Sequence, residues 1–277
     1  MRGQEVSQTA LKVAYGLVVL SAEDDWSRRL PDGLAETTER VLLESGARGF
    51  GPRLMRAARK RWMRRVHEVQ DRFMPGQFEG FGYRKIFMQH VVDEALAAGT
   101  RQVLVVAGGF DTLCLRLAPR SPDVRFFEVD HPGTSAAKAK SATALGWPPN
   151  MTLLAADLGE RPLSTVMAAN EDWDVTQPSV VVVEGLLQYL SDDDAVSLVS
   201  EVAACVPSGS RLAVSHMIPN DLKVLRGVLR LTGEPFLSSV ASEDFARYIE
   251  GTGWTVTSGV DDDSTHGIER YAVVERN

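Results

Sequence analysis

Apolar and polar positions follow two patterns along the chain, and the change comes near residue 100. Before it, apolar residues recur at helical spacing in stretches without internal proline. Breaks such as Pro31-Asp32-Gly33 and Pro75-Gly76 separate these stretches. The pattern predicts helices over residues 9–20, 34–43, 53–71 and 86–98.

After residue 100, short runs rich in β-branched residues alternate with helical stretches. This alternation requires right-handed crossovers and predicts a doubly wound α/β fold, a mostly parallel sheet with helices on both faces. The expected strands cover residues 102–107, 124–129, 152–155, 179–183, 211–216, 255–260 and 270–275, and the clearest helices between them cover residues 133–145, 192–205 and 242–252.

The last two predicted strands differ from the others. About nine residues rich in Asp, Gly and Ser separate them, too few for a crossover helix but enough for a hairpin. The last strand should therefore run antiparallel. Seven strands ending in such a hairpin are the layout of class I methyltransferases with a Rossmann-like sheet, whereas an NAD-binding Rossmann domain normally has six parallel strands. Residues 96–277 would form this core, and residues 1–95 a helical region beside it.

Composition narrows the class of protein. The chain has 277 residues, 44% hydrophobic and 24% charged, as in ordinary globular proteins. Its longest apolar runs fall short of the roughly 20 residues of a membrane-spanning helix. The two cysteines, Cys114 and Cys205, have no metal-ligand spacing and are too few for a disulfide framework. We expect a cytoplasmic protein without a metal site.

The charge distribution is uneven. A formal net charge of -7 argues against a nucleic-acid-binding protein. Residues 48–72 are the exception, with nine Lys and Arg against Glu68 and Asp71. Such a helix could bind an acidic carrier protein, a nucleic acid or a membrane surface, or it could be solvated and paired with the acidic body of the chain. We favour the solvated helix and expect neither nucleic acid nor membrane as partner; a carrier protein or a second copy of the chain stays open.

Glycine and acidic residues follow four consecutive predicted strands. Gly108 and Gly109, after the first strand, would let a ligand approach the backbone. Asp130 ends the second strand about 20 residues later, where a carboxylate can accept from both hydroxyls of a ribose. Asp157-Leu158 follows the third strand, and Glu184-Gly185 the fourth. Because ligands bind outside the carboxyl ends of parallel strands, these residues predict one binding site.

With these motifs the chain resembles the S-adenosylmethionine-dependent methyltransferases related to leucine carboxyl methyltransferase. The likeness is strongest to the bacterial branch that includes O-methyltransferases of aromatic polyketide biosynthesis. It spans nearly the whole chain. The matching pieces are Thr9-Ala10, Arg84, Ala107-Gly108-Gly109-Phe110-Asp111-Thr112, Phe127-Glu128-Val129-Asp130-His131-Pro132 with Lys138, Asp157-Leu158, and Glu184-Gly185-Leu186-Leu187-Gln188-Tyr189-Leu190.

The resemblance implies S-adenosyl-L-methionine as the cofactor and a place for each of its parts. Arg84 and the loop of Ala107, Gly108 and Gly109 would hold the methionine carboxylate, and Glu184 with Gly185 would lie beside the amino group. Asp130 would bind the ribose, and Asp157 with Leu158 the adenine. His131 is either part of this site or a turn residue before Pro132.

Three positions depart from the family pattern. Relatives usually begin the loop with glycine, where this chain has Ala107. Alanine fits there without strain if its backbone torsions are not left-handed. An arginine of the family is replaced by Leu113, and one often found in the first helix by Leu17.

The chemistry implied is methyl transfer to an oxygen of a small natural product, the small-molecule acceptor. Holding nucleophile and methyl group in contact and excluding water supply most of such catalysis, and no metal is needed. A carboxylate acceptor needs no base, whereas a phenol would gain from one. Tyr189 and His216, at the ends of the fourth and fifth strands, are the candidate catalytic residues. The alternatives are a pocket-lining Tyr189 and a structural His216.

The amino-terminal helices are the natural cover for this site. Phe73, Phe78, Phe81 and Tyr83 form an aromatic connector with interspersed glycines, which suits a mobile wall of the acceptor pocket. We expect residues 1–95 to act as a lid that selects the acceptor. The alternative is a set of helices that only cover one face of the sheet.

Two other functions fit parts of the pattern. A nicotinamide-dependent oxidoreductase shares the glycine loop and the ribose carboxylate, but Thr112 stands where the third glycine of its motif is expected. A non-catalytic, cofactor-binding regulator of the same fold is the second alternative. The sequence does not identify the acceptor.

Overall fold

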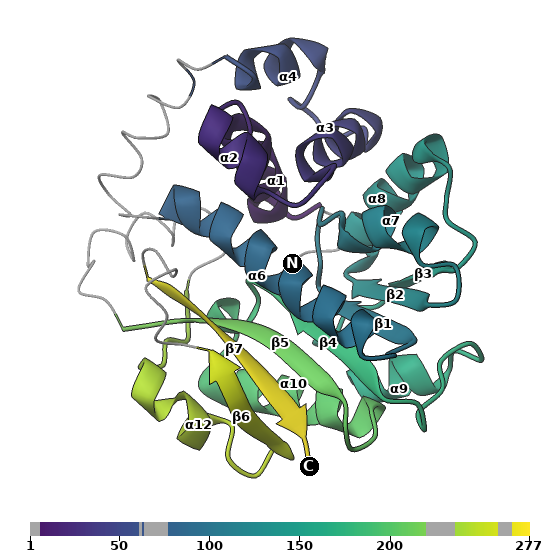
Figure 1. Cartoon of the computed structure of the whole chain (residues 1–277), viewed down its shortest axis with the longest axis vertical. Coiled ribbons are helices and arrows are strands. Elements are labelled where there is room, and N and C mark those ends of the chain that lie inside the picture. Colours follow the sequence, from purple (N-terminus) through teal and green to yellow (C-terminus); the bar gives the residue numbers. More distant parts are fainter. Residues whose placement is uncertain (1–5, 61–62, 64–76, 220–235, 260–267) are drawn as a thin grey trace.

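The computed structural model of the chain describes residues 6–60, 63, 77–219, 236–259 and 268–277 (Figure 1). Within them, seven strands form one sheet in the order β3-β2-β1-β4-β5-β7-β6. All seven predicted strands are present, each end within one residue of its expected position. They are β1 (Gln102–Val106), β2 (Arg125–Asp130), β3 (Met151–Ala155), β4 (Ser179–Val183), β5 (Arg211–Met217), β6 (Trp254–Gly259) and β7 (Glu269–Arg276).

Strand direction also follows the prediction. Strands β1 to β5 pair in parallel, and β7 runs antiparallel to both β5 and β6. In this register Glu269, the first residue of β7, pairs with Met217, the last of β5. The antiparallel strand therefore brings its first residue to the edge where the parallel strands end.

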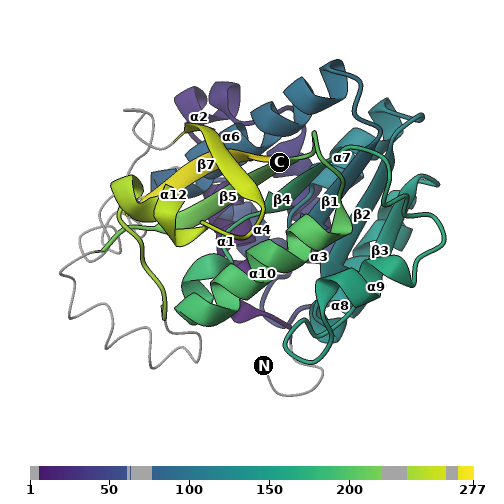
Figure 2. The ribbon, with the colours of Figure 1, turned by 90° about the horizontal axis from the view of Figure 1, so that it is seen from below.

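Helices cover both faces of the sheet, as Figure 2 shows from below. The central strands β1 and β4 are buried along their whole length, which is why their sequences are continuous apolar runs. On one side of the sheet, α1 (Gln8–Leu20), α3 (Leu34–Glu44), α4 (Pro52–Ala58), α6 (Gln77–Ala97), α7 (Leu113–Leu117) and α8 (Pro132–Leu145) share one apolar cluster with it, and α4 rests on α1 and α3. On the other side are α9 (Leu163–Ala168), α10 (Asp192–Cys205) and α12 (Phe245–Tyr248).

Local signals fix the helices nearest the strand ends. Ser7 caps α1 by accepting a hydrogen bond from the Ala10 amide. His131 caps α8, and Pro132 occupies its first turn, where a missing N–H costs nothing. Ser191 caps α10, whose first turn carries three aspartates that complement the helix dipole. The helices thus begin at defined points beside the loops that follow β2 and β4.

The amino-terminal helices share one apolar core with the sheet. Leu11 and Val18 of α1, Val41 of α3 and Met88 of α6 belong to the same buried cluster as Val103 of β1. The short helix α2 (Asp24–Arg29), which the sequence pattern did not predict, places Trp26 in a separate cluster with residues of α1. The division of the chain near residue 95 stays a prediction.

Helix α6 corrects one expectation. It begins at Gln77, nine residues before the predicted start, so Phe81 and Tyr83 lie in a helix and not in a connector. Phe78 also falls within α6, whereas Phe73 lies outside the described residues. The aromatic wall is therefore part of a 21-residue helix that contacts β4, β5 and β7.

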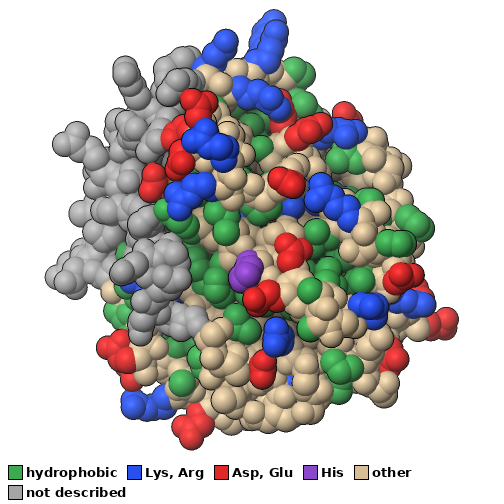
Figure 3. Space-filling view, in the orientation of Figure 1, with side chains coloured by type: hydrophobic (Ala, Val, Ile, Leu, Met, Phe, Trp, Pro, Cys, Tyr) green, Lys and Arg blue, Asp and Glu red, His purple; other side chains and the backbone are tan. Residues whose placement is uncertain are grey.

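The basic segment is described only in part. Helix α4 ends at Ala58, and residues 61–62 and 64–76 lie outside the described residues. Arg59, just after α4, pairs with Glu39 of α3. The role of the basic segment stays a prediction. Acidic and basic side chains are interspersed over the face in Figure 3. No helix among the described residues is long and apolar enough to span a membrane.

Candidate active site

A cavity of about 940 Å³ opens at the carboxyl edge of the sheet. Its wall combines the loops after β1, β2, β3 and β4 with α1, the first half of α6 and the start of β7. All but one of the predicted site residues lie in this wall: Arg84, Ala107, Gly108, Gly109, Asp130, His131, Asp157, Leu158, Glu184, Gly185 and Tyr189. The exception is His216.

The glycine loop and Asp130 hold each other in place. One carboxylate oxygen of Asp130 accepts a hydrogen bond from the Gly109 amide at 2.5 Å, and the other accepts from the His131 amide at 2.6 Å. Burial raises the pKa of Asp130, while these two amides oppose that shift. A carboxylate has about four lone-pair sites, so two backbone bonds leave room for two more donors. The pair of hydroxyls on a ribose fits that capacity.

Only glycine fits at position 109. Its backbone is left-handed, with φ of 57°, and an added Cβ would come within 2.7 Å of the Ala10 side chain on α1. Helix α1 therefore approaches the loop as closely as glycine permits. Any larger residue at this position would push α1 away from the loop.

Ala107 adopts the left-handed backbone conformation, in which an alanine is strained. Its φ is 51°, the one left-handed non-glycine residue in the described part of the chain. Its amide still donates to the Val129 carbonyl at 2.7 Å, so the strand pairing holds the residue there. A left-handed L-residue costs roughly 1–2 kcal/mol, so this loop stores backbone strain.

We expect Ala107→Gly to stabilise the protein. Relief of the left-handed strain, less the extra entropy of an unfolded glycine, should add about 0.5–1 kcal/mol and raise the melting temperature by about 2 °C. Thermal unfolding of the variant and of wild type measures the change in melting temperature. Ala136→Gly, on the exposed side of α8, is the control and should lower stability instead. A destabilised Ala107→Gly protein would contradict the assignment of strain.

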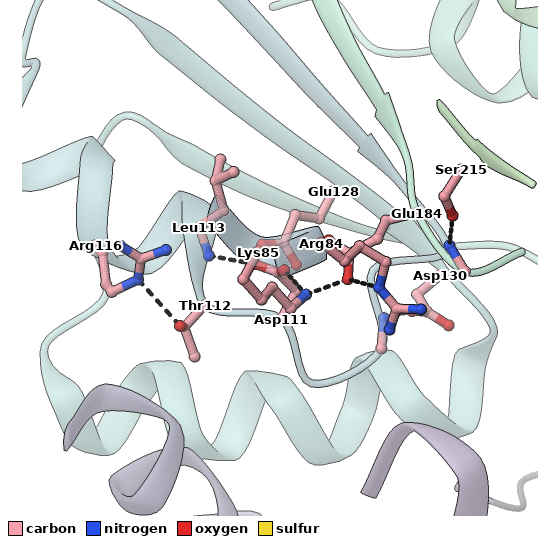
Figure 4. A network of polar contacts seen from close by, with 12 residues as sticks. Arg84, Lys85, Asp111, Thr112, Leu113, Arg116, Glu128, Asp130, Glu184 and Ser215 are labelled. Atoms are coloured by element: carbon pink, nitrogen blue, oxygen red, sulfur yellow. Dashed lines mark hydrogen bonds and ion pairs between the residues drawn. The ribbon is translucent and has the colours of Figure 1, made fainter. Parts of the chain in front are cut away.

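Arg84 joins α6 to two strand ends. Its Nε donates to Glu184 at 2.8 Å (Figure 4). Its Nη1 donates to both carboxylate oxygens of Glu269 at 2.8 and 3.0 Å. Burial by itself would lower the pKa of Arg84, but Glu269 and Glu184 outweigh it and raise the pKa. Gly185 makes room for this guanidinium, since an added Cβ would lie 3.1 Å from Nη1. Arg84 is thus fixed at the cavity with a permanent positive charge.

Lys85 extends this network to the glycine loop. Its ammonium contacts Asp111 and lies 2.5 Å from Glu184. Burial would raise the pKa of Asp111, yet the nearby Lys85 and Lys138 hold it well below its usual value. Two cations and three carboxylates therefore form one buried chain from Asp111 through Glu184 to Glu269. The network has a net formal charge of -1.

Three residues of this network were not predicted as site residues from the sequence: Lys85, Asp111 and Glu269. Asp111 stood inside the glycine-loop motif, and Lys85 directly follows Arg84. Glu269 had one available signal, because an antiparallel last strand must begin at the edge where the others end. An acidic residue at the start of an antiparallel last strand could therefore have been predicted to lie at the cavity.

Of two further acidic residues near the strand ends, Asp157 lines the cavity and Glu128 is buried in the core. His131 Nε2 lies 3.6 Å from Asp157, at the part of the cavity formed by the loop after β3. Glu128 instead contacts Lys138 of α8, and the pair is buried between β2 and α8. Burial raises the pKa of Glu128 against the opposing effect of Lys138. Asp130, and not Glu128, lines the cavity.

His216 is not brought to the cavity, which corrects the expectation that it reaches the pocket. Its ring is 2% exposed and stacks on Phe245 of α12, with centroids 4.2 Å apart and planes inclined by 8°. Burial lowers the pKa of His216 to about 4, against weaker opposing effects of the Met217 and Val240 backbone. The surroundings of His216 are those of a structural residue.

This buried histidine should make folding stability depend on pH. The folded pKa lies below the ordinary value, so the unfolded chain binds a proton first as the pH falls. Above about pH 6.5, His216 is neutral in both states and causes no loss of stability. Between pH 6.5 and 4, its protonation in the unfolded chain should lower the free energy of unfolding by up to about 3 kcal/mol. Urea unfolding of wild type and His216→Phe across this range measures it.

The variant should show a flatter loss of stability than wild type between pH 6.5 and 4. His90→Gln, which removes an exposed histidine of α6, is the control and should follow wild type. If His216→Phe has the same pH profile as wild type, the histidine is not held neutral by the fold.

Apolar side chains line the cavity beyond the charged network. Tyr189 lies 5.3 Å from Phe236, centroid to centroid. Phe81 packs against the cluster that contains Leu17 and Trp26, and its ring centroid lies 5.6 Å from the central carbon of the Arg84 guanidinium. Phe81 and Tyr189 therefore both line the cavity. No group of three or more potential metal ligands occurs among the described residues.

Known proteins match this chain over most of its length. The sequence profile of the leucine carboxyl methyltransferase family matches residues 23–203. The chain belongs to this family. A Frankia alni protein named as an S-adenosyl-L-methionine-dependent methyltransferase is 30% identical over 261 residues, 89% of this chain and 81% of the relative. A relative of the same name from Mycobacterium sp. strain KMS is 31% identical over 150 residues, 53% of this chain and 46% of the relative.

Solved structures share the fold. A protein of Thermobifida fusca described as a methyltransferase superposes with a TM-score of 0.61 at 17% identity, covering 86% of this chain and 94% of that one. A DUF574 family protein of Streptomyces avermitilis superposes with a TM-score of 0.60 at 20% identity, and the match covers 87% of this chain and 97% of that one. Fold and family confirm the prediction of an S-adenosylmethionine-dependent methyltransferase and disfavour the nicotinamide-dependent oxidoreductase.

Proposed function

We propose that this member of the leucine carboxyl methyltransferase family methylates an oxygen of a small natural product, either a carboxylate or a phenolic hydroxyl. The observation that carries the proposal is the cavity itself, in which polar groups at the strand ends lie next to an apolar wall. A cofactor at the polar end would leave the apolar end for an acceptor. The cavity volume is at the upper end of the range for small-molecule sites.

The polar end fits S-adenosylmethionine residue by residue. Asp130 has lone pairs free for the ribose hydroxyls, and Asp157 with Leu158 offers an acceptor beside an apolar surface for the adenine. The Arg84 guanidinium and the loop amides near Gly109 would bind the methionine carboxylate, and Glu184 the amino group. The net negative charge of the network suits a ligand that carries a positive sulfonium.

The reaction needs little from the protein beyond position. When bound, the cofactor would supply an electrophilic methyl group to the acceptor oxygen, and its sulfur would keep the electrons of the broken C–S bond. A phenolic acceptor would release its proton to solvent as it enters the cavity, so that the phenolate oxygen receives the methyl group. The apolar wall around Leu17, Phe81 and Phe236 would exclude bulk water from this step and hold the oxygen in line.

Binding and turnover test the proposal separately. Calorimetry should show that S-adenosylhomocysteine binds the purified protein and NADH does not. Radiolabel from methyl-labelled S-adenosylmethionine should then appear in at least one member of a panel of aromatic carboxylic acids and phenols, as a base-labile ester or a base-stable ether. Binding of NADH alone would overturn the cofactor assignment. Cofactor binding without transfer to any panel member, or to an acceptor copurified with the protein, would favour the non-catalytic regulator.

A further inference from the structure

Five charged side chains of the cavity wall form one buried chain in which acidic and basic groups alternate. Their order is Asp111, Lys85, Glu184, Arg84 and Glu269, and each side chain is at most 10% exposed. Figure 4 shows the first four of them. Both ends of the chain are carboxylates, so three negative charges meet two positive ones. Because these groups are buried, water and salt screen the excess charge far less than they would at the surface.

The two ends of this chain are balanced unequally. Burial would raise the pKa of Asp111, but two nearby lysines, one of them Lys138 of α8, hold it well below its usual value. At the other end, both oxygens of Glu269 accept from one nitrogen of Arg84. The same guanidinium also donates to Glu184, so its single charge serves two carboxylates. The excess negative charge therefore lies toward Glu269.

Glu269 stands beside the part of the cavity proposed for the methionine end of the cofactor. It lines the cavity as the first residue of β7, opposite Met217 at the end of β5. Its partner Arg84 is the residue proposed to hold the methionine carboxylate, and Glu184 is proposed to hold the amino group. On this placement, the Glu269 carboxylate lies near the part of the ligand that carries the sulfur.

The cofactor and its product differ in charge at that sulfur. At pH 7 the amino group and the carboxylate of the methionine part cancel, so S-adenosylmethionine keeps the single positive charge of its sulfonium. S-adenosylhomocysteine has the same groups but a neutral sulfur, because the positive charge is lost with the methyl group. A buried negative charge nearby attracts the first ligand more strongly than the second.

We propose that Glu269 makes the site prefer the methyl donor over its demethylated product by attracting the sulfonium charge. This rests on the proposed function and adds to it the residue that distinguishes substrate from product. Loss of the positive charge during transfer then weakens the binding of the product and favours its release. Glu269 acts in this as a specificity-determining residue and not as a base.

Calorimetry at pH 7 without an acceptor tests the preference in wild type. S-adenosylmethionine should bind about tenfold more tightly than S-adenosylhomocysteine, the order of effect expected of one unit charge opposite another in a partly buried site. Sinefungin, in which a carbon bearing an ammonium group replaces the methylated sulfur, supplies the positive charge without a transferable methyl group. Its affinity should lie within about threefold of that of S-adenosylmethionine.

Glu269→Gln removes the charge but keeps an oxygen that can accept from Arg84. It should bring the affinities of S-adenosylmethionine and S-adenosylhomocysteine within about threefold of each other, mainly by weakening the cationic ligand. Glu269→Asp keeps the charge and should keep most of the preference. Glu275→Gln, the same exchange near the other end of β7, is the control and should match wild type.

Equal or tighter binding of S-adenosylhomocysteine in wild type would overturn this proposal, as would an unchanged preference in Glu269→Gln. An equal loss of preference in Glu269→Asp would also overturn it, because shape and not charge would then decide. Glu269→Asn, matched to the aspartate variant, replaces the glutamine variant if that one does not fold. If none of the three ligands binds wild type, the proposed function fails instead.

Discussion

Arg84→Ala should lower the free energy of unfolding by about 3–5 kcal/mol, the largest effect expected of any single substitution discussed for this protein. The guanidinium is 6% exposed and pairs with Glu184 and Glu269. Removing it leaves the Glu269 carboxylate without its ion-pair partner, and leaves Glu184 with only the ammonium of Lys85, which also pairs with Asp111. Urea unfolding at pH 7 measures the loss.

Arg84→Lys should recover only part of this stability. A lysine ammonium is a point charge and cannot reproduce the two directions in which Nε and Nη1 donate to different carboxylates. Adding Glu269→Gln to Arg84→Ala should restore some stability, because it removes one unpaired charge. Arg28→Ala on exposed α2 is the control and should change stability by less than about 0.5 kcal/mol. A loss below about 1 kcal/mol in Arg84→Ala would show that the network does not hold α6 to the strand ends.

Asp130→Ala should weaken S-adenosylhomocysteine binding about tenfold to hundredfold. The carboxylate would lose its hydrogen bonds to the ribose hydroxyls, worth roughly 1.5–3 kcal/mol when a charged group is involved. The Gly109 and His131 amides would lose their acceptor as well, so the loop itself becomes less ordered. Isothermal titration calorimetry measures the change.

Asp130→Asn separates the two effects. Its amide oxygen can keep one backbone hydrogen bond but loses the negative charge, so its affinity should lie between those of wild type and Asp130→Ala. Asp157→Ala, in the neighbouring loop after β3, removes a carboxylate that accepts no bond from Gly109, so it should leave the Gly109 amide undisturbed and serves as the comparison. An Asp130→Ala protein with wild-type affinity would remove the ribose assignment.

Most of the predicted site could be recognised because a parallel sheet gathers its strand ends. Asp130, Asp157 and Glu184 each follow a strand, and the order of the strands brings them to one edge whatever the details of packing. The same reasoning located the glycine loop. It did not foresee that Ala107 takes the left-handed conformation of a glycine, because the torsion is set by the pairing of its amide with Val129.

His216 shows where the sequence pattern fails. Residues of β5 from Leu212 to Met217 are buried on both faces, so apolar alternation does not tell which side chains point to the cavity. The structure turns Ser215 toward the site, where it accepts from the Gly185 amide at 2.8 Å, and His216 toward Phe245. Because successive side chains of a strand point to opposite faces, a one-residue difference separates a residue that contacts the cavity loop from one that packs on the other side of the sheet.

The sequence by itself determined the seven-stranded sheet, its antiparallel last strand and the four strand ends that form the cavity. These features follow from the spacing of apolar residues and from the turn residues between the elements, which are local properties of the chain. Only the tertiary structure decided which charges meet there. Arg84 and Glu269 are 185 residues apart in sequence. They come within 2.8 Å because α6 packs across the sheet and β7 enters it antiparallel at the same edge. Such a contact depends on packing between distant elements, which no local pattern records.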